Sequence, residues 1–152
     1  MFSINNKTTM RKLVILFLTL IASFAAKAQN GTKIYGGKHY DQFLGCFDCD
    51  PETQNSIWSP FTEYGSSHGP KSIWNENGRY GSVTSNFSPY NPSAKYPPRV
   101  VDASGNLLGY LTVNKNNRSR LQGAISDLIC FSRDTVLKDG VEKYGKQFGK
   151  VN

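Results

Sequence analysis

The sequence has few of the residues on which most enzyme mechanisms depend. Its 152 residues include only two histidines, His39 and His68, and only three cysteines. No GxSxG nucleophile elbow, Walker-type phosphate loop or HExxH zinc motif is present. Because two imidazoles offer few general bases for a serine or cysteine nucleophile, these absences favour a protein that binds rather than catalyses, and we expect no cofactor.

The sequence also lacks an apolar run long enough to span a membrane comfortably. Its uncharged N-terminal run, residues 13–26, has 14 residues, whereas a span needs roughly 20. The basic pair Arg11-Lys12 precedes the run and Ala26-Lys27-Ala28 ends it, which is the pattern of a secretory signal peptide. We therefore predict a cleaved signal peptide over residues 1–28 and a secreted or periplasmic chain that begins at Gln29 and has no transmembrane segment. A retained N-terminal anchor is the alternative.

Charge of one sign is in modest excess. The chain carries 18 basic and 11 acidic residues, for a net charge of +7. Four basic residues and no acidic one lie in residues 1–28, so 14 basic and 11 acidic residues give the mature chain +3. Residues 95–152 hold ten basic and five acidic residues, an excess that admits nucleic acid or an anionic cell-surface polymer as a partner. A solvated helix face explains the same excess.

Between residues 56 and 96 a short pattern recurs at a constant step, which is the spacing from Ser56 to Ser72. The recurring segments are Ser56-Ile57-Trp58, Ser72-Ile73-Trp74 and Ser88-Pro89-Tyr90, with Tyr64-Gly65, Tyr80-Gly81 and Tyr96 at the same step. A repeat this short indicates one small structural unit used several times. Each serine is typical of the cap of a helical turn that a later glycine closes. We expect Trp58, Trp74 and Tyr90 to anchor these turns on a shared core.

A β-hairpin is predicted on each side of the repeats. Residues 32–50 and 98–114 each read as two strands around a turn that contains glycine. The return strands, residues 43–47 and 107–111, align with each other, and the offset between them equals four repeat steps. We therefore expect two related hairpins, packed together.

The C-terminal region has helical periodicity. Leu121, Ile125 and Leu128 recur at helical spacing after Ser119, a possible N-cap, and Ser132 or Asp134 begins a second stretch. The predicted fold is α+β: two small β-hairpins packed with short aromatic-anchored helical turns, followed by one or two C-terminal helices. We expect a single domain over residues 29–152, with the hairpins and repeats at 33–115 and the helical tail at 119–149.

The repeats and their flanking hairpins resemble a family of small exported bacterial proteins with serial Ser-Ile-Trp-Asn and Tyr-Gly-Ser repeats between Leu-Gly hairpins. The matching residues are Leu44-Gly45, Ser56-Ile57-Trp58, Tyr64-Gly65-Ser66, Ser72-Ile73-Trp74-Asn75, Tyr80-Gly81-Ser82, Ser88-Pro89-Tyr90-Asn91, Pro97-Pro98 and Gly109-Tyr110-Leu111. The resemblance covers about residues 33–115. It implies no activity, because this family is uncharacterised. Ser59 departs from the pattern, since asparagine stands at 75 and 91.

The cysteines allow several interpretations. Cys46 and Cys49 form a C-x-x-C motif, and Cys130 is the third cysteine. In an exported protein a structural disulfide is favoured, either between Cys46 and Cys49 or from one of them to Cys130. A redox-active pair is one alternative, and a zinc site completed by His39 or His68 is another.

The acidic residues beside this motif resemble the start of a calcium loop. Asp48, Asp50 and Glu52 alternate, but the sixth and twelfth loop positions are Thr53 and Ser59 instead of glycine and an acid. A solvated acidic turn explains them, and we predict no metal site.

The repeated aromatics lead to the functional prediction. With the tryptophans buried, tyrosines and asparagines of the repeats are left to line a ligand-binding surface: Tyr64, Tyr80, Tyr96, Asn75 and Asn91. We predict a secreted, non-enzymatic binding module for a glycan, a wall polymer or a protein, with no catalytic residues assigned. The alternative is a small secreted hydrolase or nuclease that uses His39 or His68 with Asp48 or Asp50.

Overall fold

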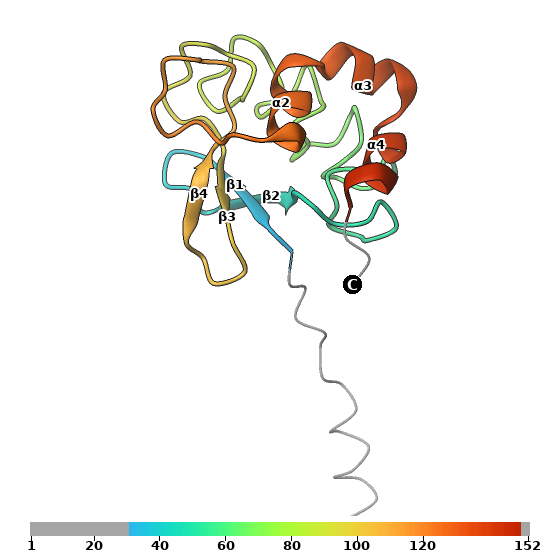
Figure 1. Cartoon of the computed structure of the whole chain (residues 1–152). Coiled ribbons are helices and arrows are strands. Elements are labelled where there is room, and N and C mark those ends of the chain that lie inside the picture. The colour runs from blue at the N-terminus through green and yellow to red at the C-terminus, as the bar shows by residue number, and fades with distance from the viewer. Residues whose placement is uncertain (1–30, 150–152) are drawn as a thin grey trace, which may run out of the picture.

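The computed structural model describes residues 31–149, in which four strands and three helices follow the predicted order. The elements are β1 (Lys33–Gly36), β2 (Gln42–Cys46), β3 (Arg99–Val101), β4 (Leu107–Tyr110), α2 (Ala124–Phe131), α3 (Arg133–Asp139) and α4 (Val141–Phe148). The strands form one antiparallel sheet of order β2-β1-β3-β4, at the lower left of Figure 1, and the helices lie at the upper right. The predicted α+β fold with two hairpins is confirmed.

The predicted signal peptide, residues 1–28, and the chain start at Gln29 lie outside the described residues. Within residues 31–149, no helix has both the length and the apolar character that a membrane crossing requires.

The sheet buries one face and leaves the other partly open. Ile34, Leu44 and Val100 are completely buried in the core. Tyr35 and Arg99, whose side chains alternate with these along the strands, are only half-buried. This division follows from the two-residue period of a strand, which sends successive side chains to opposite faces.

The two hairpins repeat each other in detail. Both have a bulge at a leucine, Leu44 in β2 and Leu108 in β4, followed by a glycine with positive φ: +118° at Gly45 and +153° at Gly109. The alignment of the two return strands is therefore a structural equivalence. Because a Cβ at either glycine would crowd the segment that follows, only glycine fits this bulge without strain.

The outer strand of each hairpin is closed by that following segment. The Cys46 N–H donates to Asn55 O (2.6 Å), and the Ile57 N–H donates to Cys46 O (3.1 Å). At the equivalent positions of the second hairpin, the Tyr110 N–H donates to Ser119 O (2.9 Å) and the Leu121 N–H to Tyr110 O (2.8 Å). One parallel bridge thus covers the last residue of each outer strand, Cys46 of β2 and Tyr110 of β4, and shortens the edge open to another strand.

The repeats are chains of hydrogen-bonded turns. In the first repeat, backbone bonds are accepted in succession at residues 56, 59, 62, 66 and 69, and in the second at 72, 75, 78, 82 and 85. Four steps of three residues and one of four account for the full period of a repeat.

The predicted helical turns are wrong in most of each repeat. Only the step of four residues is an α-type turn, from 62 to 66 and from 78 to 82, and it carries the Tyr-Gly pair. The serines explain the difference: the hydroxyls of Ser56, Ser72 and Ser88 each accept the N–H two residues ahead, at 3.1 Å. Such local side-chain bonds compete with a continuing helix.

The predicted anchors are confirmed. Trp58 and Trp74 are completely buried, with ring centroids 5.4 Å apart. Their indole N–H groups donate to backbone carbonyls, Trp58 to Phe47 O (2.9 Å) and Trp74 to Ile57 O (2.6 Å). Tyr90 is buried in the third repeat. Each tryptophan therefore ties its repeat to the preceding segment of the chain.

The C-terminal region forms three helices rather than the predicted one or two. Helix α2 begins at Ala124 after Gly123, not at Ser119, because the carbonyl of Ser119 is used at the edge of β4. Helix α3 begins after Ser132 as predicted. Gly140, with φ +94°, interrupts the second predicted helix and separates α3 from α4.

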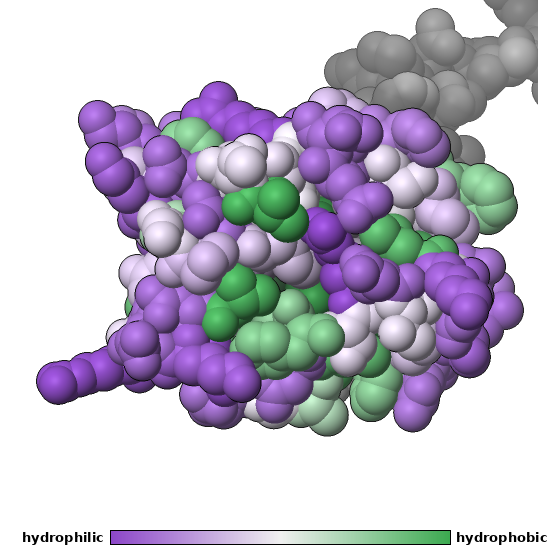
Figure 2. All heavy atoms as spheres, turned by 90° about the horizontal axis from the view of Figure 1, so that it is seen from above, coloured by the Kyte–Doolittle hydropathy of each residue, from purple (hydrophilic) through white to green (hydrophobic). Residues whose placement is uncertain are grey.

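Large exposed hydrophobic residues are scattered over the described part of the chain. They are Phe61, Val83, Leu107, Leu108 and Phe131. Figure 2, which looks down on the top of Figure 1, shows a mostly hydrophilic face with a few small hydrophobic patches near its middle. A broad apolar surface for another protein is missing from this face.

Candidate binding surface

Four side chains lie next to one another across the open face of the sheet. The register pairs Tyr35 with Phe43 on β2 and with Arg99 on β3, and Arg99 in turn with Tyr110 on β4. The ring centroids of Tyr35 and Phe43 are 5.6 Å apart in an edge-on arrangement. We call Phe43, Tyr35, Arg99 and Tyr110 the aromatic row. One arginine thus lies within a line of three aromatic rings that crosses all four strands.

Arg99 is held among aromatic rings, and no carboxylate of residues 31–149 forms an ion pair with it. Its guanidinium carbon lies 5.8 Å from the centre of the Tyr35 ring and 5.2 Å from that of Tyr40. Nη2 donates to Tyr40 O at 3.3 Å, and the buried Nε–H has no hydrogen-bond partner within residues 31–149. Cation–π contacts stabilise the charge. An unsatisfied buried donor carries a cost, so it is a feature to explain at a candidate site.

Tyr40 adds backbone strain at the same place. Of the described residues other than glycine, it alone has positive φ, +56°. Its ring centroid lies 5.9 Å from that of Tyr110. Burial raises the pKa of the Tyr40 hydroxyl above its usual value, and the neighbouring Tyr110 raises it further. Strained residues of this kind concentrate at functional sites.

One of the predicted tyrosines, Tyr64, extends the row, and another, Tyr96, packs outside it. Tyr64 packs edge-on against Phe43, with centroids 5.3 Å apart, and Lys71 Nζ lies 5.6 Å from the centre of the Tyr64 ring. Burial raises the pKa of Tyr64. Tyr96 stacks on Phe87 at 5.7 Å. Both tyrosines are half-buried, so part of each ring is accessible.

The other predicted site residues have structural surroundings. Tyr80 is 7% exposed and packs beneath Gly36, where a Cβ would lie 2.9 Å from its ring. The amides of Asn75 and Asn91 donate to Gly69 O (3.1 Å) and Ser85 O (3.0 Å). Their amide oxygens accept N–H groups two residues ahead. These side chains therefore hold the turns of the repeats in place.

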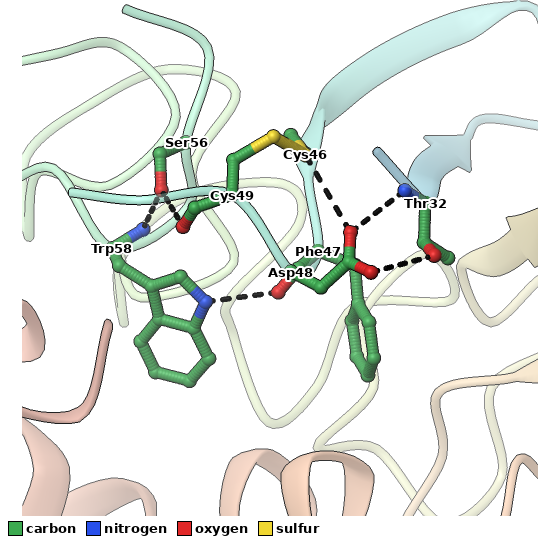
Figure 3. Close-up of a disulfide and its surroundings, with 7 residues drawn as sticks. All are labelled: Thr32, Cys46, Phe47, Asp48, Cys49, Ser56 and Trp58. Carbon is green, nitrogen blue, oxygen red and sulfur yellow. Dashed lines mark hydrogen bonds between the residues drawn. A yellow bond between two sulfur atoms is a disulfide. The ribbon is translucent and has the colours of Figure 1, made fainter. Parts of the chain in front are cut away.

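Cys46 and Cys49 form a disulfide, as predicted, and both are buried. Figure 3 shows Asp48 beside it, with Oδ1 at 3.8 Å from Cys46 Sγ. The backbone N–H and the hydroxyl of Thr32 donate to the Asp48 carboxylate, at 2.7 and 3.0 Å. The disulfide thus closes the short loop that follows β2, and Asp48 within that loop bonds it to Thr32, the residue before β1.

This cluster is also the group of described residues whose side chains could together hold a metal ion. Potential ligand atoms of Cys46, Asp48 and Cys49 lie within 4.8 Å of one another. The disulfide removes both thiolates, which are the forms that bind metal. Cys130 is a free, buried thiol, and burial raises its pKa to about 12, so it is protonated at neutral pH and unreactive.

The histidines and aspartates of the predicted enzyme alternative differ in their burial and in their hydrogen-bond partners. His39 and His68 are exposed, and a ring nitrogen of His68 lies 3.0 Å from Ser67 Oγ. Asp48 is buried and bonded to Thr32, whereas Asp50 accepts the N–H of Glu52 at 2.8 Å.

Two cavities lie away from the aromatic row. One of about 380 Å³ is lined by Tyr90, Cys130 and Arg133, and another of about 260 Å³ lies between β4 and the start of α2. Arg133 stacks on Tyr90 at 4.2 Å. It also donates to Gly81 O and to Glu76, each at 2.9 Å. The cation of the larger cavity is therefore already paired.

Sequence reasoning missed the aromatic row. Its members Tyr35, Phe43 and Arg99 were not predicted as site residues, nor was the neighbouring Tyr40, and Tyr110 appeared only as part of a hairpin. The available signal was the alternation of these residues with the core positions Ile34, Leu44 and Val100. Which strands lie side by side, and in which register, cannot be read from that alternation.

Comparison of the chain with protein-family models, with curated proteins and with solved structures finds no match. A functional conclusion therefore depends on the residues themselves.

Proposed function

We propose that this protein is an exported, non-enzymatic binding module that holds a polysaccharide on the open face of its sheet. The observation that carries the proposal is the aromatic row, which places three rings and one arginine side by side on four adjacent strands. Neighbouring strands are about 4.8 Å apart. The row therefore extends roughly 14 Å, enough for an extended polymer to contact several side chains at once.

Polysaccharide chemistry fits this surface. Sugar rings have apolar C–H faces that stack on aromatic rings and hydroxyl edges that bond to polar groups. Tyrosine offers both an aromatic body and a hydroxyl, and it has few rotatable bonds to immobilise. Tyr64 lengthens the row beyond Phe43 at one end, and Tyr40 lies beside Tyr110 at the other. Such a surface suits a repeating ligand better than a compact small molecule, which prefers an enclosed pocket.

One further feature favours a polymer over a peptide strand as the partner. The last residue of each outer strand, Cys46 in β2 and Tyr110 in β4, is bridged by the segment that follows, which shortens the edge available to an added strand.

Export is part of the proposal. The N-terminal sequence has the charge and apolar pattern of a signal peptide. The buried Cys46–Cys49 disulfide is typical of proteins that fold in an oxidising compartment. Both features support a secreted or periplasmic location.

Affinity electrophoresis in gels that contain one soluble polysaccharide each tests the proposal. We would use polygalacturonate, xylan and a mixed-linkage glucan, and compare the mature protein with its Tyr35→Ala and Tyr110→Ala variants. At least one polymer should retard the wild type, and each variant should bind it about tenfold or more weakly, because a central aromatic contact is lost.

Tyr144→Ala is the matched control, since Tyr144 is a partly buried tyrosine on α4 outside the row. Near-ultraviolet circular dichroism of the Trp58–Trp74 pair would show whether each variant is folded. Unretarded migration of the wild type in all three gels would reject the proposal. Equal weakening by Tyr144→Ala would reject the aromatic row as the binding surface.

A further inference from the structure

We propose that Arg99 recognises a carboxylate, and that the polysaccharide bound by the aromatic row is therefore an acidic one built from uronic-acid units. This inference rests on the proposed function and names its ligand class. The place of Arg99 supports it: the residue lies in the row itself, with Tyr35 on one side and Tyr110 on the other. A ligand that stacks on these rings passes directly over the guanidinium.

Within residues 31–149, no acidic side chain forms an ion pair with Arg99. Arg133 and Arg120 also lie against aromatic rings, but they form ion pairs with Glu76 (2.9 Å) and Asp127 (2.8 Å). Arg79, which lies 4.2 Å from the Phe87 ring, has no ion pair among the described residues either, but it is outside the aromatic row. Arg99 has no ion pair among the described residues, and Nη2 makes a long bond of 3.3 Å to Tyr40 O. The positive charge on the open face thus calls for an anion from outside.

The hydrogen-bonding capacity of Arg99 is also only partly used. Nε has no partner within residues 31–149. Guanidinium groups present planar pairs of N–H donors that match the two oxygens of a carboxylate, and charge-assisted bonds are roughly twice as strong as neutral ones. A small movement of the side chain on carboxylate binding would bring Nε into such a pair. A neutral sugar supplies only hydroxyls and gains less from the same arginine.

Two tyrosine rings lie against the guanidinium and restrict its movement before the ligand arrives. Tyr40 holds it from one side through its ring and its carbonyl, and does so in a strained backbone conformation. Tyr35 contacts it from the neighbouring strand. An arginine held in this way loses little conformational freedom when it binds, which favours geometric selection of a carboxylate.

Nucleic acid fits the surface less well. A single-stranded nucleic acid is bound by a track of several cations along its phosphates. The row contains one unpaired cation, and Lys71, which lies over Tyr64 at the end of the row, is paired with Glu63 at 3.1 Å. A single arginine that binds carboxylates, placed between aromatic rings that stack on sugars, therefore suits an acidic polysaccharide.

The experiment compares polygalacturonate with the same polymer after its carboxyl groups have been reduced to alcohols. Dissociation constants are measured by calorimetry at low and at physiological salt for the wild type, Arg99→Gln, Arg99→Lys and Arg118→Gln. Arg118 is an exposed arginine, so its variant makes the same charge change away from the row. A random-sequence single-stranded oligonucleotide is the additional probe.

We expect the wild type to prefer the carboxylated polymer by at least about tenfold, and Arg99→Gln to remove that preference while Arg118→Gln keeps it. Arg99→Lys should recover only part, because lysine keeps the charge but not the planar donors. Equal wild-type binding of both polymers would overturn the carboxylate inference and leave the proposed function standing. If the wild type bound neither polymer but did bind a neutral glycan, the carboxylate inference would likewise be overturned and the proposed function would stand.

Two other outcomes would overturn more than the preference for a carboxylated polymer. Absence of binding to every polysaccharide would overturn both proposals. Binding of the oligonucleotide as tightly as polygalacturonate, with the same salt dependence, would replace the acidic-sugar inference by a general anion surface. The comparison of polymers with the wild type decides the question even if Arg99→Gln does not fold.

Discussion

The two hairpins share a backbone but not a chemistry. In the first, positions 46 and 49 are joined by a disulfide. The equivalent positions in the second are occupied by Tyr110 and Val113. The bulge, its glycine and the covered edge are common to both copies. The two hairpins thus have the same backbone arrangement. Their side chains differ in role: the first hairpin carries the disulfide, and the second places Tyr110 in the aromatic row.

The largest expected effect on stability comes from replacing the bulge glycine that both hairpins share. Gly45→Ala and Gly109→Ala should each lower the free energy of unfolding by about 3 kcal/mol, because they force a positive φ on alanine and crowd the covering segment. A Cβ would lie 2.8 Å from Ile57 Cγ2 in the first case and 2.9 Å from Leu121 Cα in the second. Urea unfolding measures both. A loss below about 1 kcal/mol in one copy alone would contradict the equivalence.

Removing the disulfide tests what separates the copies. A Cys46→Ala/Cys49→Ala double variant should lose about 2 kcal/mol, the loop-entropy contribution of so short a cross-link. Amide hydrogen exchange should accelerate at Cys46 and Ile57, at the edge of β2, and stay unchanged at Tyr110 and Leu121. Cys130→Ala is the control, since it leaves the disulfide intact. Equal acceleration at both edges would mean that the disulfide does not act locally.

The smallest expected effect lies in the repeats that set the spacing between the two hairpins. Asn75→Ala and Asn91→Ala each remove a side-chain bond to a turn carbonyl and should cost about 1 kcal/mol of stability. Because these amides are occupied within the turns, polysaccharide binding should not change. Thermal unfolding and the electrophoresis described above check the two parts. A binding loss at unchanged stability would instead return both asparagines to the ligand surface.

Local chemistry explains which expectations were confirmed. The tryptophan anchors and the paired hairpins follow from short sequence signals: aromatic residues at a fixed step, and glycine after leucine in each return strand. The helical turns and the helix start at Ser119 were wrong because competing partners were not visible in the sequence. Serine hydroxyls capture nearby N–H groups, and the carbonyl of Ser119 bonds to Tyr110 across the sheet edge.

The sequence by itself determined the period of the repeats, the two related hairpins and the α+β class, since these depend on turn chemistry and periodicity within a few residues. The candidate binding surface was decided only by the tertiary structure. Arg99 meets Tyr40, 59 residues earlier, and Tyr35 pairs with it because β1 lies against β3 in one particular register. A shift of one residue would turn every one of these side chains to the other face, so the aromatic row exists only once the two hairpins have docked.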